Sequence, residues 1–261
     1  MPDRRSTLVM DATSTTPAGH QQTQTPAGPD CHLAATPLLD LDHPSIRAVV
    51  EGRGWMALDP MARIGAVYDF VRDEIAFGYN ADDDLPASRV LADGYGQCNT
   101  KATLLMALLR ASGLPCRFHA ATVHQRLQAG VVPDVVRRWA PQEILHSWVE
   151  VEGDDGWVRL EGVIIDDRYL AGLRRHLDLA DGPLLGYGVG TEDVGAPAVT
   201  WCGRDTEIQM TGLERDFGVH DDPDTWYATA GTNLSGPRAW LYRLVLRHVM
   251  NRRVRALRAT P

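Results

Sequence analysis

The chain has 261 residues, of which 44% are hydrophobic and 23% are charged, and its formal net charge is −8. This composition is typical of a globular protein with enough apolar residues for one sizeable core. The acidic balance argues against a nucleic-acid partner, because phosphate binding requires clustered cations. No stretch is apolar over the length that a membrane span requires, so we expect no membrane partner.

The cysteines and the first residues of the chain predict its surroundings. Cys31, Cys98, Cys116 and Cys202 are widely spaced and form no CxxC pair, so we expect neither a disulfide scaffold nor a zinc site. No motif predicts a metal or a cofactor. The first residues include two arginines with no apolar segment behind them, which argues against a secretory signal. We therefore expect a cytoplasmic protein whose free thiols stay reduced.

The domain organisation follows from composition along the chain. Residues 1–36 are rich in Thr, Pro, Gln, Gly and Ala, and we expect them to be a disordered tail. Residues 37–261 are expected to form a single domain, because no linker interrupts them. Its core is predicted in about residues 60–165, with a C-terminal extension in residues 166–261.

The elements before the middle of the chain are mainly helical. Residues 45–52 predict a short helix. Asp59 followed by Pro60 starts a stronger helix with apolar residues at helical spacing, which we expect to end near residues 77–78. Asp82, Asp83 and Asp84 predict an exposed acidic loop.

The middle of the chain predicts a helix followed by a sheet. Cys98 begins a helix with a buried leucine stripe, and Gly113 is a natural C-cap. The remaining predicted elements, in chain order, are a strand at 115–123, a polar insertion with a short helix at 124–142, a hairpin of strands 144–152 and 157–165, a helix at 169–177, an irregular region at 180–236 with a short helix near 223–230, and a long amphipathic helix at 237–257. One helix packed on a small antiparallel sheet, with extra C-terminal helices, makes an α+β fold.

Cys98 is the candidate nucleophile. It occupies the first turn of its predicted helix, directly after a glycine-rich turn. The unpaired N–H groups and the dipole at this end of a helix favour a thiolate. Cys116 instead lies inside an apolar strand, where a cysteine is usually structural.

His146 and Glu161 are the candidate partners of Cys98. A thiol near pH 7 is mostly protonated and needs a base beside it, and His146 lies on the strand before the hairpin turn. Glu161 lies on the return strand, roughly opposite His146. A carboxylate there would orient the imidazole and stabilise the imidazolium, as the third member of a triad does.

These motifs, in this order, resemble the transglutaminase-like superfamily. The resemblance is carried by Gly96-x-Cys98, by His146-x-Trp148-Val-Glu, and by Trp157-x-x-Leu160-Glu161. It implies a papain-like α+β core and a Cys-His-acid triad. One departure is that the family usually has Asp-Pro where this chain has Glu161-Gly162, so Asp166 or Asp167 is the alternative acid.

The chemistry implied is acyl transfer through a thioester on Cys98. The thiolate attacks an amide or thioester carbonyl, and preorganised donors stabilise the oxyanion. The Cys98 N–H is one candidate donor. A side chain of Tyr95, Gln97 or Asn99 is a candidate second donor, and Trp148 is a candidate wall of the substrate site.

Three functions fit this pattern. The first is a protease or amidase that transfers the acyl group to water, and the second is an acyltransferase that uses an amine. The third is a non-catalytic binding module that retains the fold. The expected partner is a peptide, amide or thioester substrate, including one borne by a carrier protein. The oligomeric state is left open.

Overall fold

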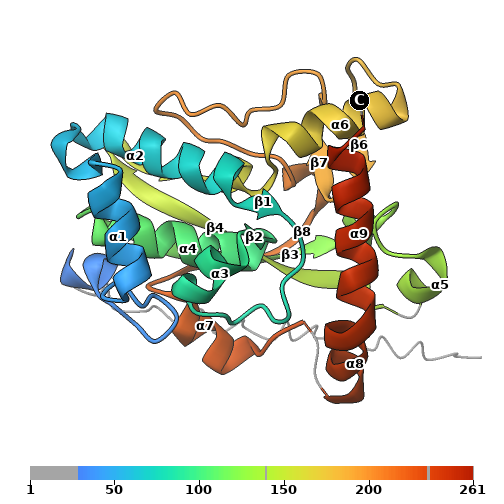
Figure 1. The fold of residues 1–261 in the computed structure, drawn as a ribbon, viewed down its shortest axis with the longest axis horizontal. Coiled ribbons are helices and arrows are strands. Elements are labelled where there is room, and N and C mark those ends of the chain that lie inside the picture. The colour runs from blue at the N-terminus through green and yellow to red at the C-terminus, as the bar shows by residue number, and fades with distance from the viewer. Residues whose placement is uncertain (1–28, 139, 234–235, 261) are drawn as a thin grey trace, which may run out of the picture.

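The computed structural model describes residues 29–138, 140–233 and 236–260, and its centre is one helix packed against one sheet (Figure 1). Helix α4 (Cys98–Ala111) is covered by strands β3 and β4 on one side and by helices α1, α2 and α3 on the others. The predicted α+β fold with an antiparallel sheet is therefore confirmed.

The described residues form the following elements. The helices are α1 (Pro44–Gly52), α2 (Pro60–Asp69) continued by a π-helix (Phe70–Glu74), α3 (Ala87–Asp93), α4, α5 (Asp134–Arg137), α6 (Asp167–Leu177), α7 (Pro223–Ala230), α8 (Gly236–Leu241), a π-helix (Tyr242–Leu246) and α9 (Arg247–Arg258). The strands are β1 (Ala76–Phe77), β2 (Tyr95–Gly96), β3 (Cys116–His124), β4 (Glu143–Gly153), β5 (Gly156–Arg159), β6 (Leu184–Gly186), β7 (Val189–Thr191) and β8 (Leu213–His220).

Helix α4 is buried on all sides. Every residue from Asn99 to Arg110 is buried, so the helix forms the centre of the core. Fully burying each leucine side chain contributes roughly 1.5–3 kcal/mol. This packing fixes the position of the first residue of α4, which is Cys98.

The main sheet has the strand order β5-β4-β3-β8, and all three pairings are antiparallel. Strand β3 pairs with β4 along its whole length, from Cys116 with Val151 to His124 with Glu143. Strand β5 pairs only with the far end of β4, and its last pair is Arg159 with Glu150. Among the described residues, the part of β4 that carries His146 therefore has no strand on its β5 side.

Two expectations about the sheet are wrong. The return strand was predicted to run to residue 165, but β5 ends at Arg159 and Glu161–Ile164 form a 3-10 helix. The region 180–236 was predicted to be irregular, but it contributes β8 as the outer strand beside β3. β8 carries the polar run Glu-Arg-Asp, and none of its residues is buried, so it lacks the hydrophobic alternation of a half-buried strand.

The predicted tail boundary is also corrected. Residues 1–28 lie outside the described residues. Residues 29–36 were expected to belong to the tail, but Pro29–Leu33 form a 3-10 helix and the following residues contact the domain. Arg110 donates a 2.7 Å hydrogen bond to the carbonyl of Ala34, and the His32 ring packs edge-on against Trp157. These long-range contacts have no signal in the local composition.

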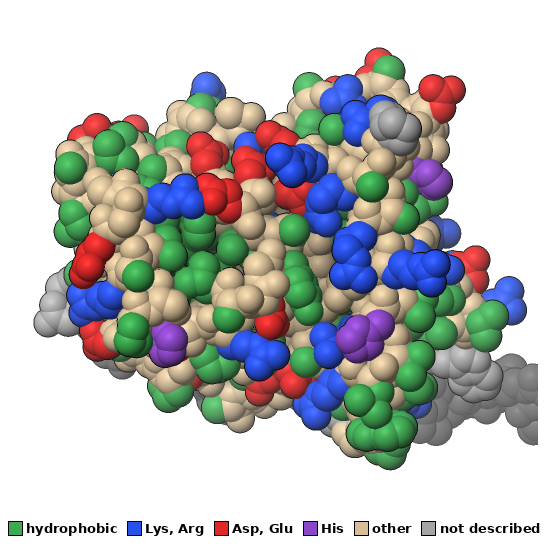
Figure 2. Space-filling model, in the orientation of Figure 1, with side chains coloured by type: hydrophobic (Ala, Val, Ile, Leu, Met, Phe, Trp, Pro, Cys, Tyr) green, Lys and Arg blue, Asp and Glu red, His purple; other side chains and the backbone are tan. Residues whose placement is uncertain are grey.

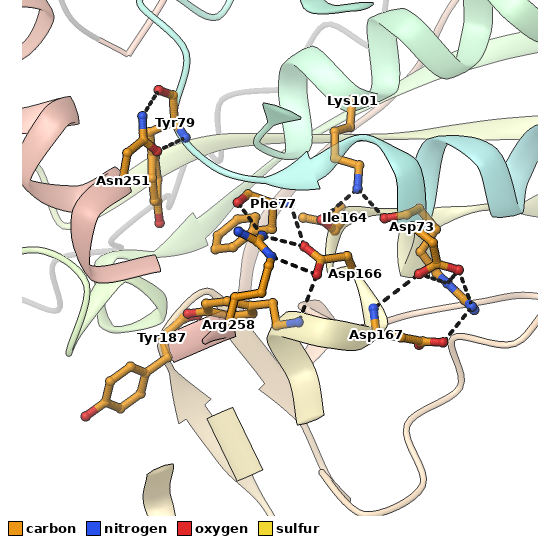
Figure 3. Close-up of polar contacts among 12 residues, drawn as sticks. Asp73, Phe77, Tyr79, Lys101, Ile164, Asp166, Asp167, Tyr187, Asn251 and Arg258 are labelled. Atoms are coloured by element: carbon orange, nitrogen blue, oxygen red, sulfur yellow. Dashed lines mark hydrogen bonds and ion pairs between the residues drawn. The ribbon is translucent and has the colours of Figure 1, made fainter. Parts of the chain in front are cut away.

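The C-terminal helices are attached to the core by polar contacts. The long helix predicted at 237–257 is present as α8 and α9 with a π-helical turn between them. Arg258 of α9 binds Asp166, and the carboxylate of Asp166 also accepts the backbone N–H groups of Phe77 and Tyr169 (Figure 3). One buried carboxylate thus joins α9, β1 and the start of α6.

The surface over these helices is basic in one part and hydrophobic in another. Basic side chains gather over α9, and hydrophobic side chains are exposed at the α8 end (Figure 2). Within the described part of the chain, no helix combines the length and the apolar character needed to cross a membrane.

Lys101 is a fully buried lysine one turn into α4. Its Nζ donates to the carbonyl oxygens of Arg72, at 3.0 Å, and Ile164, at 3.2 Å (Figure 3). It thereby joins the middle of the π-helix after α2 to the 3-10 helix that begins at Glu161. Burial lowers the pKa of Lys101 to about 7, against the opposing effect of the Asp166 and Asp73 carboxylates.

We predict that replacing Lys101 changes how stability depends on pH. Between about pH 7 and pH 10 the unfolded chain binds a proton on Lys101 that the folded chain does not, so wild-type stability gains up to ~1.4 kcal/mol per pH unit from this group. Methionine does not titrate. The free energy of unfolding of Lys101→Met minus that of the wild type should therefore fall as pH rises from 7 to 10, measured by urea unfolding.

The matched control is Leu105→Met, a non-titrating change at a buried position of the same helix. Its difference from the wild type should not vary with pH. A Lys101→Met difference that is equally constant would contradict the lowered pKa.

Candidate active site

Cys98 is the first residue of α4 and is partly exposed at the wall of a cavity. The N–H groups in the first turn of a helix have no acceptors within the helix, so they and the dipole favour a negative sulfur. The chain must pass closely by this turn. A Cβ on Gly96 would lie 2.8 Å from both the Thr100 Oγ1 and the Lys101 Cγ, so only glycine fits.

His146 lies on β4, paired with Ala121 of β3, and its side chain is fully buried. Its Nε2 lies 3.3 Å from the Oε1 of Glu161, whose side chain is also fully buried. Neither ring nitrogen makes a hydrogen bond of normal geometry to any described residue. The Cys98 thiol is the second group that interacts with this ring.

The charge of His146 depends on these two neighbours. Burial alone lowers the pKa of a histidine, but the Cys98 thiol and the Glu161 carboxylate outweigh burial and raise the pKa of His146 to about 9. The imidazole is therefore protonated at neutral pH. A protonated imidazole beside a cysteine is an arrangement that nucleophilic catalysis uses.

Glu161 is held in place by a segment far away in sequence. Its carboxylate accepts the backbone N–H groups of Ile208 and Gln209, the second at 3.1 Å. A Cβ at Gly162 would lie 2.7 Å from the Tyr68 hydroxyl and 2.9 Å from the Cβ of Thr206, so glycine is required directly after Glu161. The departure from the Asp-Pro pattern thus coincides with tight packing at residue 162.

The sequence prediction that Glu161 faces His146 is met, although the contact arises differently from the one expected. Glu161 starts a 3-10 helix beyond the paired part of β5. The alternative acids do not lie at the site. Asp166 binds Arg258 and caps α6, and Asp167 is largely exposed beside Arg72.

Of the candidate oxyanion donors, Gln97 and Asn99 line the cavity with Cys98. Both amide hydrogens of Asn99 are already used, by Asp83 at 3.0 Å and by the Leu145 carbonyl at 3.3 Å. The amide of Gln97 makes only longer contacts, to Asp83 at 3.3 Å and to the Asp82 carbonyl at 3.5 Å. An oxyanion would therefore replace the present acceptors of the Gln97 amide more easily than those of the Asn99 amide.

Tyr95 and Trp148 do not line the cavity. The Tyr95 side chain packs against Gly78, where a Cβ would lie 3.0 Å from its ring. Trp148 stacks on His119 with ring centroids 4.0 Å apart, and its centroid lies 5.7 Å from that of His146. Trp148 thus supports the His146 ring from the side and is not a wall of the cavity.

Asp83 is a residue whose importance the sequence did not indicate. The acidic run 82–84 was expected to be an exposed loop, but Asp83 is only 8% exposed. Its carboxylate accepts hydrogen bonds from the side chains of Gln97, Asn99 and Asn233 and from the Asn233 backbone. It thereby connects the start of α4 to the segment after α7. A run of three aspartates gives no signal of which one is buried.

The cavity beside Cys98 has a volume of about 150 Å³. Its walls come from the end of β3, the insertion 124–142, and the helices α8 and α9. The insertion and the C-terminal extension therefore cover the nucleophile on the side away from α4.

A second group of Cys, His and Asp lies elsewhere. Candidate ligand atoms of Cys31, His32 and Asp221 lie within 4.8 Å of one another. None of the three lines the cavity of Cys98. Burial and Asp221 raise the pKa of the Cys31 thiol, and three ligands are fewer than a structural zinc site uses. The expectation of no metal site is therefore unchanged for these residues.

Three solved structures are similar to part of the chain. A proposed cysteine protease from Cytophaga hutchinsonii is 13% identical, with a TM-score of 0.45, over 80% of this chain and 50% of that one. The periplasmic domain of TgpA from Pseudomonas aeruginosa is 22% identical, with a TM-score of 0.33, over 49% of this chain and 45% of that one. Red sea bream transglutaminase is 18% identical, with a TM-score of 0.28, over 39% of this chain and 22% of that one.

This chain thus spans half or less of each of these three proteins. No curated protein matches it. The family model for the transglutaminase-like superfamily matches residues 47–162. The matched segment contains Cys98, His146 and Glu161, so the similarity to the transglutaminase-like superfamily covers all three candidate catalytic residues.

Proposed function

We propose that this protein is a cysteine-dependent acyl-transfer enzyme that acts on an amide or thioester carbonyl. The observation that supports this most directly is the buried pair of His146 and Glu161 next to Cys98 at a helix N-terminus. A thiolate, a proton donor and an orienting carboxylate are the groups that thioester chemistry requires.

The proposed reaction has two halves. In the first, the Cys98 sulfur bonds to the carbonyl carbon, and the oxyanion accepts hydrogen bonds from the Cys98 N–H and from Gln97. The carbon–nitrogen or carbon–sulfur bond then breaks, and the His146 imidazolium gives its proton to the leaving amine or thiolate. In the second half, neutral His146 takes a proton from water or an amine, which attacks the thioester and releases Cys98.

The alternative of a non-catalytic binding module is less well supported. Burying an imidazole and a carboxylate costs folding free energy unless each is well paired. Among the residues that the structure describes, the ring nitrogens of His146 make no hydrogen bond of normal geometry beyond the 3.3 Å ion pair with Glu161. A buried ion pair beside a thiol has no evident use in a scaffold but suits a group that exchanges protons with Cys98.

We predict that His146 controls the reactivity of Cys98 at low pH. With imidazolium beside the sulfur, Cys98 should react rapidly with iodoacetamide at pH 6.5, where an ordinary thiol is only about 1% ionised. His146→Gln should reduce this rate by about 10- to 100-fold at pH 6.5. The difference in labelling rate between the wild type and His146→Gln should narrow above about pH 9. In this range wild-type His146 loses its proton and a free thiol ionises unaided.

The measurement is peptide-resolved mass spectrometry at limiting reagent, with the exposed Cys202 as the internal reference thiol. The control variant is His248→Gln, at an exposed position on α9. A pH profile of Cys98 labelling that is the same in His146→Gln and the wild type would rule out the proposed pair.

We predict that Glu161→Gln impairs turnover much more than folding. Glutamine keeps one acceptor for the Ile208 and Gln209 N–H groups, but it removes the charge that stabilises the imidazolium. Acyl transfer from an activated thioester should fall by about 10²- to 10⁴-fold, measured as thiol release. Asp166→Asn should lower stability by a larger amount than Glu161→Gln while retaining more activity, because Asp166 binds Arg258 and not His146. If Asp166→Asn instead lost more activity than Glu161→Gln, the assignment of Glu161 as the acid of the triad would be contradicted.

A further inference from the structure

The chemical character of the cavity beside Cys98 indicates which acyl groups it accepts. This inference rests on the function proposed above. The cavity lies against the nucleophile, so the part of a substrate adjoining its reactive carbonyl is the part that would occupy it. Its volume of about 150 Å³ is that of a cavity that holds a benzene ring, or about six carbon atoms.

The walls of the cavity are mainly aliphatic and aromatic. They include Val123 and Leu127 around the end of β3, Ile144 of β4, and Tyr242, Leu246 and Met250 of the C-terminal helices. Such walls favour apolar groups, because each methylene moved out of water adds to the affinity.

The charged side chains that line the cavity are all acidic. They are Asp82, Asp83 and Glu143, and the described lining residues include no lysine or arginine. Asp82 is paired with Arg243 and Glu143 with Arg215, whereas Asp83 is bound only by amide groups. A carboxylate or phosphate on the substrate would therefore find no cation within the cavity and would be repelled.

We propose that the acyl group transferred to Cys98 is an uncharged apolar chain of up to about six carbon atoms. The sulfur of Cys98 displaces the thiol of a thioester, or the amine of an amide, and the apolar chain lies between β4 and the C-terminal helices. The polar side-chain amide of a glutamine and a dicarboxylic acyl group are both disfavoured.

The test is a series of N-acetylcysteamine thioesters with acetyl, butyryl, hexanoyl, decanoyl and phenylacetyl groups. Acylation of Cys98 is followed by intact mass and by release of the thiol. We expect the second-order rate constant to rise about threefold to fourfold per methylene, and so about 100-fold from acetyl to hexanoyl, and to rise no further at decanoyl. Phenylacetyl should react about as fast as hexanoyl.

The charge preference is tested with a pair of donors of the same shape. Succinyl and 4-methylpentanoyl thioesters differ mainly in replacing a carboxylate by an isopropyl group. The 4-methylpentanoyl donor should react at least tenfold faster. Equal rates, or faster reaction of succinyl, would overturn the proposal.

Variants of Leu246 test where the chain lies. Leu246→Trp fills the cavity and should reduce the ratio of hexanoyl to acetyl rates toward one, whereas Leu246→Ala enlarges it and should raise the ratio of decanoyl to hexanoyl rates. Leu244→Trp is the matched control, because Leu244 is on the same helical turn but is 54% exposed. Its ratios should equal those of the wild type.

Failure of this inference can be distinguished from failure of the proposed function. If Cys98 is acylated by the acetyl donor but shows no preference for apolar chains, the cavity does not select the acyl group and the function still stands. If no donor acylates Cys98 in a folded protein, both the function and the acyl preference are wrong.

Discussion

The fully buried contact between His146 and Glu161 is the constraint on which the rest of the site depends. Two ionisable groups removed from water are stable only if each meets a partner, and the partners here come from separate parts of the chain. Strand β4 positions His146, and the 3-10 helix after β5 positions Glu161. The backbone N–H groups of Ile208 and Gln209 donate hydrogen bonds that hold the Glu161 carboxylate in place. The raised pKa of His146 follows from this arrangement together with Cys98.

The same constraint explains the limited length of β5. Had β5 continued past Arg159 along β4, Glu161 and Gly162 would have been held in an extended ladder. Instead the chain turns into a 3-10 helix, and Lys101 donates a hydrogen bond to the carbonyl of Ile164 at the end of that helix. The buried lysine of α4 and the acid of the site are thus joined through one turn of backbone.

Much of this site was predictable because its signals are local. A cysteine after Gly96 at the start of an apolar helix, a histidine on an alternating strand and an acid after a tight turn are each visible within about ten residues. The contacts made by Asp83, Ile208 and Gln209 were not predictable, because their partners lie far away in the sequence and backbone N–H groups carry no side-chain signature. Strand β8 was missed for a related reason, since its pairing with β3 rather than its own pattern makes it a strand.

The burial of Lys101 has a consequence for self-modification. It is the only lysine among the 261 residues, and its Nζ is enclosed by the carbonyls of Arg72 and Ile164. The basic residues at the surface are arginines, whose guanidinium groups stay protonated and are poor nucleophiles. A thioester on Cys98 would therefore meet no accessible lysine amine on the same 261 residues of a neighbouring copy.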